Sequence, residues 1–173
     1  MNAPAVAVGV VIDRLLGEPP ARWHPVAWFG TTMTSIEQRC WADDRRRGVA
    51  YTVVGVLIGV APAVVLRRLV GPTTAVVVAS SIAMAGAMLE REARAVAEAL
   101  ADDDLDAARV AVGRIVGRAT DTLDASQVAR ATVETIAENT VDAVTATVLW
   151  ACVGGSFGAL AHRAINTMDA MVG

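Results

Sequence analysis

The sequence predicts an all-α protein, a polytopic integral membrane protein with a cytoplasmic helical segment between its membrane segments. Of its 173 residues, 54% are hydrophobic and 19% are charged, and the mean hydropathy of +0.47 is high for a soluble domain of this size. Two apolar runs close to the roughly 20 residues of a membrane helix flank a short charged turn. No segment stands out for the alternation of apolar and polar residues that is typical of strands.

The first apolar segment, Ala3–Leu16, is a weak candidate for a membrane helix because Asp13 and Arg14 interrupt it. The N-terminus lacks the basic region and small-residue cleavage site of a secretory signal, so we expect this segment to be retained. The proline- and glycine-rich stretch 17–25 then predicts an extended loop that carries His24. Loops on rigid scaffolds often hold functional residues.

Residues 51–89 are predicted to form a transmembrane hairpin, with helices at Tyr51–Leu66 and Ala75–Leu89. Arginine, glycine and proline residues between these helices predict a tight turn. More arginines flank the outer ends of the hairpin than its turn, namely Arg45, Arg46, Arg47, Arg91 and Arg94 against Arg67 and Arg68. The positive-inside rule therefore places both outer ends, and residues 90–140, on the cytoplasmic side of a multi-pass cell-membrane protein.

The cytoplasmic region is predicted to be helical. Glu90–Ala101 and Leu105–Val116 have the pattern of two amphipathic helices joined by an aspartate triplet. Asp103 or Asp104 is the expected N-cap of the second of these helices, and Ser126 is the expected N-cap of the helix that follows.

Carboxylates recur every four residues on that next helix. Glu134, Glu138 and Asp142 fall within about 80° of arc, with Asn139 beside them. Many soluble helices carry such acids simply as a solvated face. Here the stripe enters the apolar run Val141–Ala161, where acidic side chains need a counter-charge that a divalent cation would supply. The stripe is therefore a candidate metal site.

The run Val141–Ala161 is long enough to cross a bilayer, which would put residues 162–173 on the far side of the membrane. That placement conflicts with a cytoplasmic role for the same residues. Gly154 and Gly155 offer an alternative, because a broken or re-entrant helix is tolerated where its backbone lines a cavity. Both topologies stay open at this point.

Composition excludes several classes of function. All 15 basic residues are arginines, so the chain cannot carry a lysine-containing phosphate loop, a Schiff-base nucleophile or a pyridoxal-phosphate anchor. A net charge of −3 and a pI near 5.3 speak against nucleic acid as a partner. Cys40 and Cys152 are too few for a disulfide framework or a zinc site.

Four stretches match a known family in order and spacing, and they read DRLLGEPPARWHPVAWFG, VGRATDTLD, VETIAENTVDAV and INTMDAMVG. Together they resemble the cobalamin-biosynthesis membrane proteins of the CobD/CbiB family, the adenosylcobinamide-phosphate synthases, over the whole chain. The resemblance implies an enzyme that joins a carboxyl group of adenosylcobyric acid to aminopropanol, or to its O-phosphate, as an amide. It also implies a need for ATP and Mg²⁺, a corrinoid and an amino alcohol as substrates, and the lipid bilayer as surroundings.

The candidate site residues come from these motifs and from the chemistry of such a reaction, in which Mg²⁺ takes oxygen ligands and cations hold phosphoryl groups. The metal and catalytic candidates are Glu134, Glu138 and Asp142. His24 is a further catalytic candidate, and its alternative role is that of a backbone-bonded turn residue. The candidates for binding phosphate or substrate are Arg114, Arg118, Asn139, Asn166, Thr167 and Asp169. For the last three, which form the motif N-T-x-D, a helix cap is the alternative.

The chain departs from the family pattern at several positions, among them Glu18, where the family usually has an aspartate, and in its length. Ala119 stands where the family usually has an aspartate, which removes a charge from the predicted phosphate site. The family typically continues well beyond Gly173, so residues 1–173 are interpreted as an N-terminal half and a single helical membrane domain, with a C-terminal half or a second copy as partner. Two alternatives stay open: a non-catalytic membrane sensor or scaffold of the same fold, and a soluble helical bundle whose apolar runs form its core.

Overall fold

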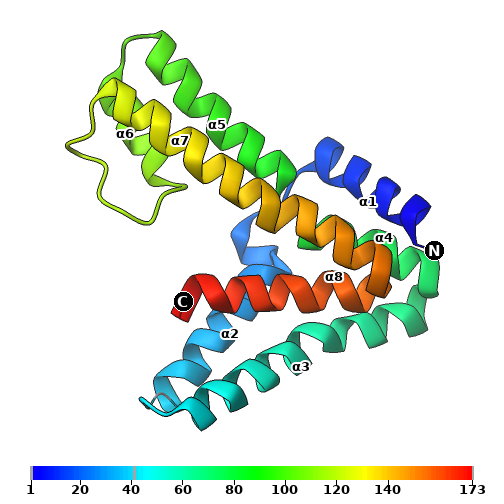
Figure 1. Ribbon diagram of the computed structural model, residues 1–173. Coiled ribbons are helices and arrows are strands. Elements are labelled where there is room, and N and C mark those ends of the chain that lie inside the picture. Colours follow the sequence, from blue (N-terminus) through cyan, green and yellow to red (C-terminus); the bar gives the residue numbers. More distant parts are fainter. Residues whose placement is uncertain (1, 41, 173) are drawn as a thin grey trace.

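The structure, a computed structural model, describes residues 2–40 and 42–172. Most of these residues are helical and no strand is present within these ranges, which confirms the all-α prediction (Figure 1). In chain order the elements are α1 (Ala3–Leu16), the short 3₁₀ helix η1 (Ala21–Trp23), α2 (Pro25–Cys40), α3 (Arg45–Val70), α4 (Pro72–Ala83), α5 (Gly86–Ala101), α6 (Leu105–Gly113), α7 (Ala125–Thr140), the π-helix η2 (Val141–Thr145) and α8 (Ala146–Val172).

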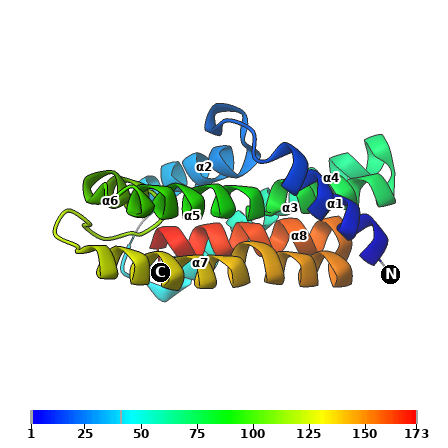
Figure 2. The same ribbon diagram turned by 90° about the horizontal axis from the view of Figure 1, so that it is seen from above.

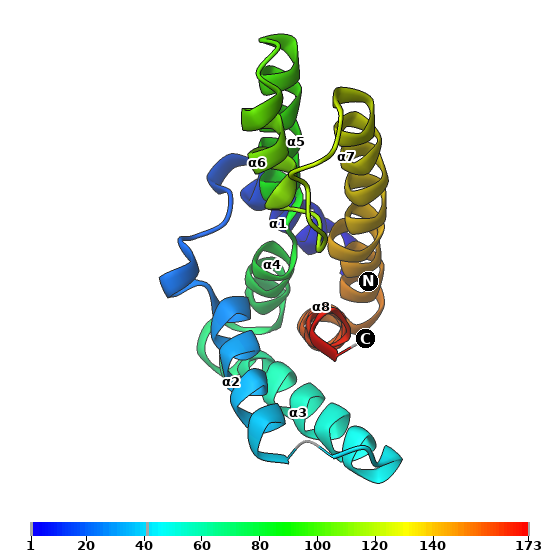
Figure 3. The ribbon, with the colours of Figure 1, turned by 90° about the vertical axis from the view of Figure 1, so that its left-hand side faces the viewer.

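The helices form three groups along the molecule (Figure 3). Helices α5, α6 and α7 gather at one end, α2 and α3 at the other, and α1, α4 and α8 lie between them. The core of the middle group is built largely from alanine, with the members Ala5, Val6, Val76, Ala79, Ala83, Ala151 and Ala159. Small side chains let helices approach closely, and a Cβ on Gly9 in α1 would collide with Ser80 in α4.

Helices α5, α6 and α7 share a separate apolar core, formed by Val96, Ala108, Ala111, Val112, Val128 and Ala131. Figure 2 shows α6 beside α5, with the loop to α7 at that end of the molecule. As predicted, Asp104 caps α6, because its carboxylate accepts a hydrogen bond from the Ala107 backbone N–H at 2.9 Å. The predicted cap Ser126 is wrong, because Asp124 caps α7 and forms a reciprocal capping box with Gln127.

Three helical segments are long and apolar enough to cross a membrane, namely Arg45–Val70, Pro72–Ala101 and Ala125–Val172. The first of them, α3, buries little of its surface, and large apolar side chains such as Leu57 and Leu69 are exposed. Exposing such a face to water is costly, whereas contact with lipid is favourable. The structure therefore fits an all-α membrane protein better than a soluble bundle.

A tight turn joins α3 to α4, where Gly71 has φ +80° and Pro72 begins α4. This is the turn predicted between the two arms of the hairpin. The second arm, however, is not one helix over Ala75–Leu89, because Met84 and Ala85 are non-helical and separate α4 from α5. Both residues are buried, so the break lies inside the protein.

The N-terminus of α5, at this break, is capped from another helix. Asp13 of α1 is only 4% exposed, and its Oδ2 accepts a hydrogen bond from the Ala87 backbone N–H at 3.2 Å. Gly86 leaves room for this contact, since a Cβ there would lie 2.9 Å from the same oxygen. A carboxylate at a helix N-terminus satisfies unpaired N–H groups and is favoured by the helix dipole. Asp13, which interrupts an apolar run of the sequence, thus stabilises the break.

Replacing Asp13 by alanine is expected to lower the free energy of unfolding by about 1 to 3 kcal/mol, because buried N–H groups at the start of α5 lose their acceptor. Thermal unfolding of the detergent-purified protein measures this loss. Asp121→Ala, at an exposed aspartate between α6 and α7, is the matched control and should change stability by less than about 0.5 kcal/mol. Equal stability of the two variants would contradict the capping role.

Helix α8 reverses direction at Gly155, which has φ +61° and ψ −143°. Figure 1 shows its second arm returning past α4 and α3 toward the C-terminus. A Cβ on Gly158 would collide with the backbone of Trp150, so the two arms lie in close contact beside the turn. The run Val141–Ala161 is therefore not one straight helix, and the broken-helix alternative describes it.

Candidate functional site

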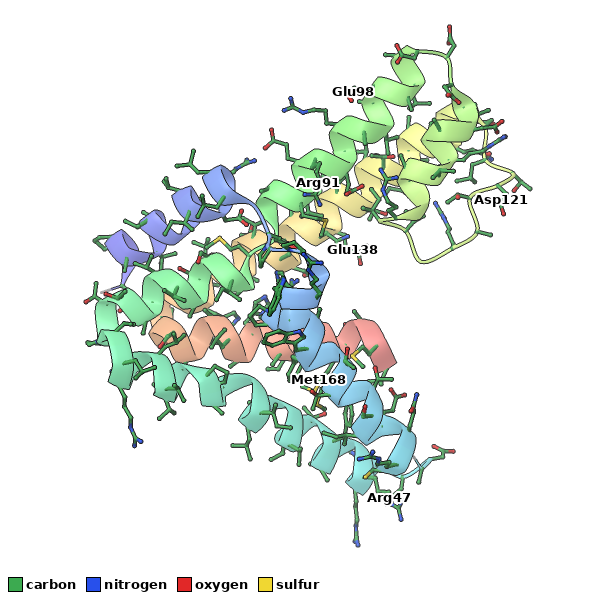
Figure 4. The ribbon with its side chains drawn as sticks, turned by 180° about the vertical axis from the view of Figure 1, so that it is seen from behind. Arg47, Arg91, Glu98, Asp121, Glu138 and Met168 are labelled. Atoms are coloured by element: carbon green, nitrogen blue, oxygen red, sulfur yellow. The ribbon has the colours of Figure 1, made fainter. Side chains whose placement is uncertain are left out.

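Residues from distant parts of the chain meet at a cavity of about 900 Å³. They come from the stretch 18–34, from α5, from α7 and from the second arm of α8. The charged, imidazole and amide side chains that line it are Glu18, His24, Arg91, Asn139, Arg163 and Asn166. A volume of this size suits a small-molecule ligand. Another cavity, of about 760 Å³, lies where α2 ends and α3 begins, near Arg47 in Figure 4, and holds none of the predicted site residues.

Glu18 and His24 face each other at the first cavity. His24 is 6% exposed, and its Nδ1 accepts a hydrogen bond from the Val26 backbone N–H at 3.2 Å. The neutral ring therefore carries its proton on Nε2, which lies 3.6 Å from Oε2 of Glu18. Burial lowers the pKa of His24, and the nearby Arg163 charge adds to this effect, so the ring is neutral near pH 7.

Glu18 is the better proton acceptor of this pair. Burial raises its pKa, while the Arg163 charge opposes that shift. Its Oε1 is buried and has no hydrogen-bond partner among the described residues. In this tautomer His24 has no free basic nitrogen. The residue is bonded to the backbone of the turn, as its alternative role predicted, and it also lines the cavity. The geometry thus favours Glu18, rather than His24, as a base.

The second arm of α8 presents three polar side chains to the cavity. Arg163, Asn166 and Thr167 are spaced i, i+3 and i+4, which places them on one face of the helix. The Thr167 hydroxyl donates to the Arg163 backbone carbonyl at 2.8 Å. Because these residues lie inside α8, the alternative of a helix cap for the N-T-x-D motif is wrong. Asp169 is exposed and lies outside the cavity lining.

The carboxylate stripe on α7 does not line this cavity. Glu134 is exposed and pairs with Arg130 at 2.7 Å, Glu138 is exposed, and Asp142 lies in the π-helix. Residues i and i+8 are about 12 Å apart along a helix, which is too far for all three carboxylates to share one ion. Within residues 2–40 and 42–172, no group of three or more His, Cys, Asp or Glu side chains could hold a metal ion. The geometry therefore does not support the stripe as a ready metal site.

Asn139, which flanks the stripe, is the residue of α7 that faces the cavity. Its Nδ2 donates to the Thr135 backbone carbonyl at 2.9 Å, which leaves the amide oxygen and the second amide N–H available to a ligand. The helix is thus turned so that its amide, and not its row of acids, points at the candidate site.

The two arginines predicted to hold phosphate also lie elsewhere. Arg114 pairs with Glu92 at 2.7 Å, and Arg118 is exposed in the loop after α6, where its charge couples to that of Glu134. Figure 4 shows Asp121, in the same loop, well away from Met168 on the second arm of α8. Neither arginine is part of the cavity lining.

The arginines that line the cavity are instead Arg91 and Arg163. Neither was predicted from the sequence as a site residue. Arg91 was counted only as a charge that flanks a membrane helix. For Arg163 a signal was available, because it stands three and four residues before Asn166 and Thr167 and directly follows an apolar run. A helical wheel of α8 puts all three on one face.

A hydrogen bond across the hairpin holds the two sides of the site together. His162, on the second arm of α8, lies 2.8 Å through its Nε2 from the Asp142 backbone carbonyl in the π-helix. A carbonyl can only accept, so this Nε2 carries the proton. Single π-helical turns are frequent at functional sites, and here the bond fixes the α7 side of the cavity relative to the α8 side.

Known proteins resemble this chain along nearly its whole length. The family model described as CobD/Cbib protein matches residues 6–173. Cobalamin biosynthesis protein CobD of Mycobacterium tuberculosis (strain CDC 1551 / Oshkosh) is 37% identical over 177 residues, which cover 99% of this chain and 56% of that protein. Proteins of the same name from Chromobacterium violaceum and Halalkalibacterium halodurans are 38% and 39% identical, over 58% and 56% of their lengths.

No solved structure matches the chain. The chain spans a little over half the length of the curated relatives it matches. The family match nevertheless extends over almost every residue and includes all of the residues that line the cavity. The chain therefore belongs to the CobD/CbiB family.

Proposed function

We propose that this protein acts in cobalamin biosynthesis as an amide-forming enzyme that joins adenosylcobyric acid to aminopropanol or its O-phosphate. The observation that carries the proposal is that three of the four motifs, far apart in the sequence, supply side chains to one cavity. Family membership supports the pathway, because relatives bear the name cobalamin biosynthesis protein. The chain spans about 56% of such a relative, so the proposal applies to the protein of full family length.

The cavity offers the groups that amide formation requires. The amine must lose a proton as it attacks the activated acyl carbon, and Glu18 lies buried with an oxygen free to accept that proton. Attack forms the C–N bond, and the activating group leaves with the electrons of the C–O bond. Arg91 and Arg163 place positive charge where the acid groups of the substrates would lie.

ATP and Mg²⁺ stay predictions from the family resemblance. Among the described residues, the donor set at the cavity contains a single carboxylate, Glu18, which does not by itself make a protein-held metal site. We therefore assign no chemical step of this chain to a metal ion. We also propose that the protein is a multi-pass protein of the cell membrane with this cavity on the cytoplasmic side; the three candidate membrane helices and the distribution of arginines support this proposal.

The test is a reaction with the intact gene product purified from membranes, supplied with adenosylcobyric acid, ATP, Mg²⁺ and either aminopropanol or aminopropanol O-phosphate. Mass spectrometry is expected to detect the amide product with one of the two amines. Binding of adenosylcobyric acid with no product from either amine would reject catalysis and favour the sensor or scaffold alternative.

A further inference from the structure

Arg163 is a cation placed at the cavity without an acidic partner in the described part of the chain. Its side chain is half-buried, and its Nε is buried with no hydrogen-bond partner among the described residues. Its situation differs from that of the other arginines, since those without a carboxylate within 4.0 Å are exposed to solvent, and six have such a partner: Arg14, Arg91, Arg94, Arg109, Arg114 and Arg130. Removing a charge from water without a partner is costly, so this arrangement needs an explanation.

Glu18 does not provide the missing partner. The charges of Glu18 and Arg163 influence each other, but no ion pair between them is formed within 4.0 Å. The carboxylate of Glu18 lies instead beside Nε2 of His24, at 3.6 Å. The guanidinium of Arg163 is therefore available to something that enters the cavity.

The surroundings of Arg163 match an oxyanion. A guanidinium is a rigid fork of N–H donors that fits a carboxylate or a phosphate through two parallel hydrogen bonds. Asn166 and Thr167 lie on the same helix face, and Arg91 adds a second positive charge to the lining. The two guanidinium groups and the Asn166 amide can donate hydrogen bonds to anionic oxygens, whereas the Thr167 hydroxyl already donates to the Arg163 backbone carbonyl.

We propose that Arg163 binds an oxyanion of the ligand, either the carboxylate of a corrinoid acid or the phosphate of an amino alcohol ester, and so determines which substrates the cavity accepts. This inference rests on the proposed function for the identity of the two acids. It also explains why an unpaired arginine is kept at this position, because the ligand completes the ion pair.

The experiment compares binding of matched ligand pairs to the intact, detergent-purified protein. One pair is adenosylcobyric acid and the derivative in which its free carboxylate is an amide; the other is aminopropanol O-phosphate and aminopropanol. We expect the protein to prefer the anionic member of one pair, and Arg163→Met to abolish that preference with a loss of about 10- to 100-fold in affinity. The ligand pair that Arg163→Met no longer discriminates identifies the oxyanion that Arg163 binds.

Stability separates this role from a structural one. Arg163→Met should leave the thermal midpoint of the unliganded protein unchanged or higher, because it removes an uncompensated charge, and Arg163→Lys should retain part of the affinity. Arg68→Gln, at an exposed arginine on α3, is the control and should keep full binding. The inference is overturned if neither pair is discriminated, if Arg163→Met keeps the preference, or if this variant is strongly destabilised. Anion binding that depends on Arg163, without any amide product, would reject the proposed reaction alone.

Discussion

Replacing Gly155 by alanine is expected to destabilise the protein by about 2 to 4 kcal/mol. This is the largest loss of stability that we predict for a single substitution. Gly155 has φ +61° and ψ −143°, a region that residues with a Cβ rarely occupy. The added Cβ would also lie 3.3 Å from the Asn2 amide and 3.4 Å from Val76. Asn2 donates to the Cys152 carbonyl at 3.2 Å, so the variant disturbs the contacts that close the turn of α8.

Gly154 provides a matched control one residue away. A Cβ at Gly154 meets no atom within 4 Å, and the backbone there is helical, so Gly154→Ala should be neutral or slightly stabilising. The measurement is the fraction of monodisperse protein after detergent extraction, followed by thermal unfolding. Similar behaviour of the two alanine variants would mean that the chain does not reverse at Gly155.

Replacing Glu18 by glutamine is expected to reduce turnover of the intact enzyme by about 10²- to 10⁴-fold, because the amide cannot accept the proton of the attacking amine. The change in size is small, so binding of adenosylcobyric acid should be preserved. Glu134→Gln is the control: this glutamate is exposed and paired with Arg130, and its loss should change turnover by less than about threefold. A larger loss from Glu134→Gln than from Glu18→Gln would restore the carboxylate stripe as the catalytic feature.

The pH profile gives the same assignment a second test. Burial raises the pKa of Glu18, so the carboxylate needed to accept a proton is lost as pH falls through a value above the ordinary glutamate range. Burial lowers the pKa of His24, so its ring becomes protonated at a lower pH than an ordinary histidine. We therefore expect an acid limb in kcat/KM that disappears in the Glu18→Gln variant. An acid limb of the same position in that variant would assign the titration to another group.

Local chemistry made part of the fold predictable. The turn at Gly71 and Pro72 and the cap at Asp104 depend on residues that are neighbours in the sequence. The break between α4 and α5 was not predictable in this way, because the Asp13 carboxylate that caps it comes from another helix. Ser126 and Asp124 both belong to residue types that cap helices well, and only the glutamine at the third helical position identifies Asp124 as the cap.

The candidate site shows the same division. His24, Asn139, Asn166 and Thr167 were found because they stand in recognisable motifs, and all four line the cavity. The acids of α7 were predicted to form a metal site because their periodicity places them on one face of the helix. Periodicity does not determine what that face contacts. Which face of α7 turns inward is decided by packing in the α5–α7 group, where Val128 and Ala131 are buried.

The length of α3 relates the cavity to the thickness of the membrane. Arginines stand at both ends of this helix, and residues 48–66 between them span roughly 28 Å at 1.5 Å per residue, close to the hydrocarbon thickness of about 30 Å. Charged side chains that reach both headgroup layers resist vertical displacement. Because α8 packs against α3, we expect the same match to set the position of Arg163 relative to the membrane surface. Reconstitution in lipids of shorter or longer acyl chains should therefore change how readily water-soluble substrates reach the cavity.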